Sequence, residues 1–223
     1  MKRVPIFPLP ETVFFPGTAL PLHLFEPRYV QMAADAIAGE RELVVVLLEP
    51  GWENDHAGNP PVHDIATLGI IEDYEELEDG RYNITLRGAE RVRLRAPDDD
   101  EVRVGKLYRE RVIESAPERH PDETDASTIA MIGRLRTCWQ ELWEKSGRPG
   151  SVNVTSSPSR FDVFVNRIAN TLDIPPRLKQ TLLEEDDVLA RSAQLAGFME
   201  EQLKFWRTLA IFRKLKPEDP SVN

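Results

Sequence analysis

Apolar residues in the first half of the chain alternate with polar ones or form short runs interrupted by Gly, Pro and Asp, which is typical of strands and turns. Asp79-Gly80 separates two such runs and predicts a hairpin, because Gly80 tolerates the positive φ that tight turns demand. Many short strands favour a compact, partly closed barrel over an open sheet. The predicted strands cover residues 4–8, 18–24, 43–48, 65–77, 81–86, 91–96 and 102–113.

One helix is expected among these strands. Glu26 precedes Pro27, and a proline at the first helical position loses no hydrogen bond and already has a helical φ. Gly39 ends the pattern. The face expected to be buried consists of Tyr29, Met32, Ala33 and Ala36.

Helical spacing replaces the strand pattern from about residue 121. A first stripe, closed by Gly147, contains Ile129, Ile132, Leu135, Cys138, Trp139, Leu142 and Trp143. A second helix is predicted to begin with Ser157 as its cap and Pro158 at its first position. It is expected to bury Phe161, Phe164, Val165, Ile168 and Leu172, and Pro175-Pro176 ends it and opens the next helix.

The last helical pattern covers residues 187–215, about 40 Å at 1.5 Å per residue. A helix of that length is expected to pack along the strand half or against another subunit. Its stripe contains Val188, Leu195, Met199, Leu203, Trp206, Leu209 and Phe212, and the tryptophans on both stripes are expected in the core. The predicted fold is therefore α+β, with a β-rich part over 1–118 and a helical part over 119–223.

Three segments have the composition of loops or a tail. Residues 51–64, rich in Gly, Pro and Asn, are predicted to form a surface flap near a binding surface, and 147–158 a second loop. Residues 217–223 read as a frayed terminus. Trp52, a large aromatic in the polar flap, is a candidate anchor for a partner.

Specific motifs resemble the amino-terminal, substrate-handling domain of Lon proteases. The run LPLHLFEPRY over 20–29 follows FPLP at 7–10 and FPG at 15–17. Further matches are ELVVVLLE at 42–49, LGII at 68–71, DGR at 79–81 with Gly88 and Arg91, and KQTLLE at 179–184 with Arg191. The resemblance spans nearly the whole chain and is weakest over 109–155.

The resemblance implies a β-rich, PUA-like pseudobarrel followed by a helical bundle with a long C-terminal helix. It also implies that the protein binds client or unfolded polypeptides without catalysis, as an adaptor or regulator of proteolysis or protein quality control. A protease is a further partner that the resemblance suggests. The binding groove is expected on the β-half beside the helical half, with Phe25, Arg28, Tyr29 and Trp52 as its polypeptide-binding residues.

No catalytic module is recognised. The G-x-x-x-x-G-K-[ST] phosphate loop of the Lon ATPase module is missing from the sequence, and the family places its peptidase dyad in a later module. The chain therefore reads as a stand-alone domain that is not an enzyme, with no catalytic residues and no cofactor.

The formal net charge of -10 disfavours nucleic acid as a partner, since such binding depends on clustered Lys and Arg. The local basic stripe of Arg87, Arg91, Arg93 and Arg95 is followed at once by an acidic run, 98–101. The single Cys138 excludes an internal disulfide, and no secretory signal is recognised, so a cytoplasmic location is expected. No apolar run approaches the roughly twenty residues that cross a bilayer, and no membrane role is expected.

Two other sites are considered. Asp55, His56, His63 and Asp64 carry metal-binding groups, but their spacing matches no metal motif, and no metal is predicted. His23 and Glu26 are expected to be satisfied by neighbours, with Glu26 capping the helix or pairing with Arg28. The alternative function is a small-molecule sensor, which three exposed aromatics converging on one pocket would favour. The oligomeric state and the client stay open.

Overall fold

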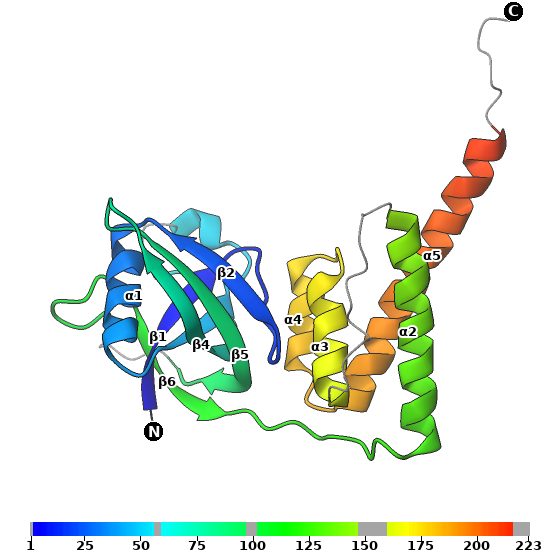
Figure 1. Ribbon diagram of the computed structural model, residues 1–223, viewed down its shortest axis with the longest axis horizontal. Coiled ribbons are helices and arrows are strands. Elements are labelled where there is room, and N and C mark those ends of the chain that lie inside the picture. The colour runs from blue at the N-terminus through cyan, green and yellow to red at the C-terminus, as the bar shows by residue number, and fades with distance from the viewer. Residues whose placement is uncertain (1, 56–58, 97–101, 147–159, 216–223) are drawn as a thin grey trace, which may run out of the picture.

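The computed structural model describes residues 2–55, 59–96, 102–146 and 160–215. It has two parts lying side by side, a strand-rich part and a helical part, joined by the extended segment 116–125 (Figure 1). The change from strand to helix falls where the sequence pattern predicts it. The expected boundary at 118/119 lies within the joining segment and stays a prediction.

The strands form a closed barrel with one added strand. Among the described residues the sheet has six strands in the order β2-β5-β4-β3-β1-β6, and β6 also pairs with β5, which closes a ring of five. β1 and β3 are parallel, and the other pairs are antiparallel. The strands are β1 (Lys2–Leu9), β2 (Ala19–Leu24), β3 (Glu42–Leu47), β4 (Ile65–Glu76), β5 (Tyr82–Leu94) and β6 (Glu110–Ser115). The predicted partly closed barrel is confirmed.

Two strand predictions are wrong. The expected strands 81–86 and 91–96 form the single strand β5, because Gly88 does not break the strand but lets the backbone of Phe15 and Pro16 pass close to it. The expected strand 102–113 is reduced to β6, since residues 102–109 fold back toward the first helix. The hairpin at Asp79-Gly80 is confirmed, with Gly80 at φ 79°.

The sheet carries an apolar cluster on each of its two faces. Alternate residues from all five ring strands, such as Val44 and Val92, gather in one cluster that fills the barrel. Leu43 and Val45 face the other way and pack with α1 (Pro27–Ala38). The helix begins at Pro27 and ends before Gly39 as predicted, and its four expected core residues are buried.

Four helices form the second part: α2 (Ala126–Ser146), α3 (Phe161–Thr171), α4 (Pro176–Glu184) and α5 (Val188–Leu215). The face predicted for α3 is buried, and Pro176 opens α4 as expected. The predicted cap Ser157 and Pro158 lie outside the described residues, and the described helix begins at Phe161. None of the described helices combines the length and apolarity needed to cross a membrane.

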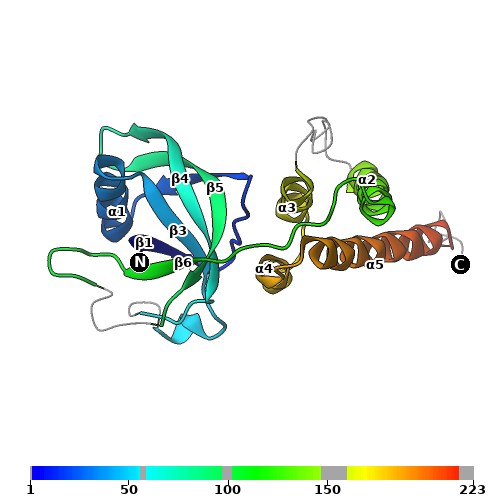
Figure 2. The same ribbon diagram turned by 90° about the horizontal axis from the view of Figure 1, so that it is seen from below.

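Among the stripe residues of α2 and α5 whose side chains the structure describes, only Ile129 and Trp206 are exposed; the side chains of Leu209 and Phe212 lie outside that set. Cys138 and Trp139 are buried and Trp143 is half-buried, whereas Ile129 is 57% exposed. Trp206 is 37% exposed, so its predicted place in the core is wrong. In Figures 1 and 2, α5 runs alongside α2, past its end and away from the barrel. The expected packing of α5 along the strand half is therefore also wrong.

The two parts share a core and several buried hydrogen bonds. The apolar cluster of the helical part includes Val13, Phe15, Leu47 and Ile65 from the strand-rich part. The Gln180 amide of α4 donates to the Ile65 carbonyl at 2.9 Å. The barrel and the helices are thus packed together and do not merely share a linker.

Candidate functional site

A groove of about 620 Å³ opens on the barrel and is called the barrel groove below. Its lining residues are drawn from segments 6–10, 22–29 and 102–109, with Leu48, Trp52, Asn59 and Pro60. It therefore lies on the β-half, as expected. It does not lie beside the helical half: no described residue of α2 to α5 lines it, and α1, whose first turn does, covers the side of the barrel away from those helices (Figures 1 and 2).

Three of the predicted binding residues occupy the corner where β2 meets α1. Phe25 is 63% exposed and forms part of the rim. Arg28 donates to Glu26 Oε2 at 3.0 Å through Nε, and its guanidinium lies 4.6 Å from the centre of the Tyr29 ring. Tyr29 is buried and meets Phe7 edge-on, with ring centres 4.5 Å apart. The corner thus gives the groove an apolar floor and an aromatic and charged rim.

The neighbours of this corner are satisfied locally. Glu26 makes no side-chain cap and pairs with Arg28, which is one of the two expected arrangements. His23 Nδ1 and Asn83 Oδ1 are 2.8 Å apart, so the imidazole has the neighbour that was expected.

Trp52, the fourth predicted residue, also lines the barrel groove. It begins the short 3₁₀ helix η1 (Trp52–Asp55) and packs against the cluster that fills the barrel. Its ring is half-buried and is not the freely exposed anchor that the composition of the flap suggested. The structure therefore brings Phe25, Arg28, Tyr29 and Trp52 to one groove.

Segment 102–109, which was predicted to be a strand, supplies the opposite rim. The Gln31 side chain of α1 holds it through two hydrogen bonds, from Nε2 to the Gly105 carbonyl (2.8 Å) and from the Leu107 N–H to Oε1 (2.7 Å). Val102 and Leu107, which is 59% exposed, project at the groove. Sequence reasoning missed this rim because its alternating valines imitate a strand, although Gly105 signalled a turn.

Two buried polar side chains complete the floor. Tyr108 donates to Asp35 Oδ2 (2.7 Å) and accepts from Lys106 Nζ (2.6 Å). Burial is the main cause that raises the pKa of Tyr108 to about 12, with Lys106 opposing and Asp35 assisting. Arg109 donates from Nη1 to the Pro60 carbonyl at 2.9 Å, and burial lowers its pKa from the usual value.

The barrel groove does not meet the criterion set for the sensor alternative. Of the described aromatic residues lining it, only Phe25 is exposed; Trp52 is half-buried, and Phe7, Tyr29 and Tyr108 are buried. A cage of three exposed rings is not formed by the described part of the chain.

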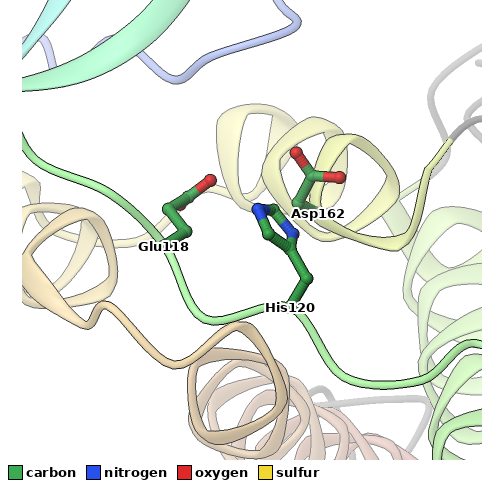
Figure 3. A group of neighbouring side chains, drawn as sticks. All are labelled: Glu118, His120 and Asp162. Carbon is green, nitrogen blue, oxygen red and sulfur yellow. The ribbon is translucent and has the colours of Figure 1, made fainter.

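Glu118, His120 and Asp162 approach one another beside α3, with one ligand-type atom of each within 4.8 Å of the others (Figure 3). Both carboxylates are already paired. Arg160 donates to the two oxygens of Asp162 at 3.0 and 2.8 Å, and Arg191 pairs with Glu118. This excess of guanidinium charge disfavours a metal cation and indicates a structural contact.

Of the residues first considered for a metal, His63 has a partner in the helical part. His63 Nδ1 lies 3.0 Å from Glu184 Oε1 of α4, so this imidazole joins the barrel to the helices. His56 and the side chain of Asp55 lie outside the described residues.

The basic stripe on β5 is largely engaged. Arg87 pairs with Glu72, and Arg95 donates from Nε to Glu114 at 2.9 Å. Arg91 is buried and donates from Nη2 to the Glu184 carbonyl at 3.0 Å. Burial, followed by the nearby charge of Arg191, lowers the pKa of Arg91. Arg87 and Arg95 are thus paired with surface carboxylates, and Arg91 belongs to the interface with α4.

A family model and the most similar curated proteins point to the same family. The model of the ATP-dependent protease La (LON) substrate-binding domain matches residues 3–201. The chain is 24% identical over 203 residues to Lon protease of Flavobacterium johnsoniae and 28% identical over 200 residues to Lon protease 4 of Sorangium cellulosum. These alignments cover 90% and 88% of this chain but 24% and 23% of the two relatives. The chain thus spans about a quarter of the length of the Lon proteases it matches.

Two solved structures have a similar fold. The Lon N-terminal domain protein from Xanthomonas campestris matches with a TM-score of 0.61 at 22% identity, covering 89% of this chain and 99% of that chain. The N-terminal domain of Mycobacterium avium complex Lon protease matches with a TM-score of 0.65 at 18% identity, covering 89% and 98%. With the family match over residues 3–201, the resemblance seen in the sequence is confirmed: the chain belongs to the Lon protease substrate-binding domain family.

Proposed function

We propose that this domain binds extended, apolar segments of polypeptide in the barrel groove and presents them as an adaptor or regulator of proteolysis. The observation that carries the proposal is the arrangement of the groove. Exposed apolar side chains, Phe25, Val102 and Leu107, stand around a floor of buried aromatic and aliphatic residues. Membership of the Lon substrate-binding family supports a protein as the ligand.

The backbone beside the groove suits an extended chain. Among the described strands β2 pairs only with β5, so its other edge is open, and Leu22, His23 and Leu24 of β2 line the groove. The Thr18 carbonyl accepts from the Gly88 N–H. By alternation along the strand, the backbone groups of His23 point toward the open edge. A bound segment can therefore use backbone hydrogen bonds as well as apolar contacts.

The polar groups of the groove favour binding over catalysis. Arg28 is paired with Glu26, His23 with Asn83, and Tyr108 with Asp35 and Lys106. A general base must lie within hydrogen-bond reach of the proton that it removes and have a pKa near the working pH. A nucleophile needs such a base beside it. We therefore propose a non-catalytic role for these 223 residues.

The test is a titration of fluorescently labelled, unfolded casein against the wild type and variants, followed by anisotropy. Phe25→Ala is expected to weaken binding about tenfold, because an exposed aromatic at an interface contributes roughly 1–2 kcal/mol. Trp52→Ala is expected to weaken binding by up to roughly thirtyfold. Ile129→Ala is the matched control, since Ile129 is similarly exposed but lies on α2, away from the groove.

Circular dichroism must show equal folding of all variants. Because Trp52 also packs on the barrel cluster, Phe25→Ala is the cleaner of the two tests. If the wild type binds casein and both Phe25→Ala and Trp52→Ala bind it equally well, the polypeptide binds outside the barrel groove. If the wild type fails to bind at high micromolar concentration, the polypeptide-binding proposal is refuted.

A further inference from the structure

A second groove of about 580 Å³ lies in the helical part and is called the helical groove below. Its walls are α2, α5 and the residues 172–175 that join α3 to α4. It shares no lining residue with the barrel groove. The function proposed for the barrel groove therefore leaves it unexplained.

The helical groove is rich in aromatic side chains that the fold does not cover. Trp139 is buried at its floor and stacks obliquely with Trp143, with ring centres 5.4 Å apart. On the α5 wall, Phe205 is 63% exposed and Trp206 is the partly exposed ring noted above. Large exposed rings beside a concave apolar surface are typical of a partner-binding site.

The charged groups at this groove have one sign. Asp173 and Glu201 line it, and the described lining residues include no Lys, Arg or His. Neither carboxylate forms an ion pair within 4 Å with another described residue. Of the nearby cations, Arg207 donates to both oxygens of Glu141. Lys179 donates to the Asn170 carbonyl, and the charge of Asp173 opposes the lowering of the Lys179 pKa by burial, but Lys179 does not line the groove. The described lining of the groove thus carries negative charge only.

The spacing of the aromatic residues suits a helical ligand. Phe198 and Phe205 line the groove from α5 two turns apart, about 10 Å at 1.5 Å per residue. Trp139 and Trp143 are one turn apart on the facing helix. An amphipathic helix presents its apolar side chains at the same intervals, i, i+3, i+4 and i+7.

We propose that the helical groove binds a cationic amphipathic helix of a partner polypeptide. Its apolar face packs on Trp143 and Phe205, and its Lys or Arg side chains pair with Asp173 and Glu201. Complementary charge at the rim fixes which partner is accepted, since an acidic helix would place like charges together. The site is separate from the barrel groove, so the two proposals can fail independently.

The test uses a fluorescein-labelled synthetic helix of Leu and Lys, with Leu at the spacing above, and a matched peptide with Glu in place of Lys. We expect the Lys peptide to bind, more weakly as salt is raised, and the Glu peptide not to bind. Phe205→Ala and Glu201→Lys should each weaken binding about tenfold. Phe25→Ala, in the other groove, should change it by less than about twofold.

Both substituted side chains are exposed, so folding is preserved. Equal affinity for the two peptides, or affinity that survives both Phe205→Ala and Glu201→Lys, would overturn the proposal. Loss of binding in Phe25→Ala alone would also overturn it and place the peptide in the barrel groove. Light scattering tests whether a second copy of the chain fills the groove instead. A dimer that dissociates in Phe205→Ala, together with no binding of the Lys peptide, would show that it does.

Discussion

Replacing Arg191 by Met tests the polar junction between the barrel and the helices. Arg191 lies in the first turn of α5, and its side chain is fully buried. Its Nη1 donates to Asn166 Oδ1 at 3.0 Å, its Nε donates to the Glu185 carbonyl at 3.1 Å, and its guanidinium pairs with Glu118. Arg191→Met keeps most of the apolar volume and removes all of these contacts.

The expected loss of stability is large because one buried charge loses its partner. Removing one member of a buried ion pair costs about 3–5 kcal/mol. The lower end, about 3 kcal/mol, applies here because Arg91 Nη1 stays 3.7 Å from Glu118 Oε1 and offsets part of the lost attraction. The matched control is Arg119→Met. The Arg119 guanidinium pairs with Asp186 but is exposed, so this substitution should lower the free energy of unfolding by less than about 1 kcal/mol.

Urea unfolding followed by circular dichroism and tryptophan fluorescence gives both free energies. Because Arg191→Met and Glu118→Met remove the same ion pair, the double variant should lose less stability than the sum of the two single losses. If Arg191→Met lies within about 1 kcal/mol of the wild type, as Arg119→Met should, the junction is not the stabilising contact described. A double variant whose loss equals the sum of the two single losses would contradict the charge argument specifically.

Other predictions concern a close approach and a helix cap. Gly88→Ala should destabilise the barrel by about 1–3 kcal/mol in urea titration, since a Cβ would meet the Phe15 carbonyl oxygen and lie 3.0 Å from Pro16 Cα; an unchanged midpoint would show that the loop yields freely. Asp187→Ala should cost about 1 kcal/mol, because Asp187 Oδ1 accepts from the Leu189 and Ala190 N–H groups at the start of α5, whereas Asp187→Asn should retain most of the stability. The same N–H groups, Ala190 first, lower the pKa of Asp187 below 3.8, so its contribution is present at neutral pH and is lost as pH falls below about 3.8; stability curves of wild type and Asp187→Ala should converge there.

Local signals in the sequence were sufficient where local chemistry decides the structure. Pro27 starts α1, and Asp79-Gly80 turns the chain between β4 and β5, because proline and glycine restrict or widen φ regardless of distant contacts. The barrel itself followed from the number and shortness of the strands. Its closure by β5 and β6 required three-dimensional pairing that no periodicity contains.

The wrong strand predictions have a common cause. Residues 87–90 were left out of the predicted strands, yet the missing side chain of Gly88 lets the backbone of residues 15 and 16 pass close to a continuous β5. Val102 and Val104 alternate like strand residues, but Gln31 on α1 binds the backbone of this segment and holds it at the groove. In both places tertiary contacts outweigh the local pattern.

Half of the barrel groove could be predicted from the sequence. The motif around Phe25, Arg28 and Tyr29 is continuous in the chain, and Trp52 was conspicuous in a polar loop. Arg109 and Leu107 reach the same groove only because the chain folds back on α1, so no spacing could have placed them there. The helical groove was missed because Trp206 continues an apolar stripe at helical spacing, which predicts a core position, although the ring is exposed in the fold.

The pairing of β1 limits when the barrel can be completed during synthesis. Lys2 pairs with Ile113, about a hundred residues later in the chain, although Ile6 pairs with Val44 much earlier. At a synthesis rate of about 5–20 residues per second, β1 waits on the order of 5 to 20 s for β6 to emerge. Such distant pairing also slows folding, because a long loop must close before its contacts form. The first strand to be made therefore stays incompletely paired until the last strand emerges, and its β6-facing edge is open until the barrel closes.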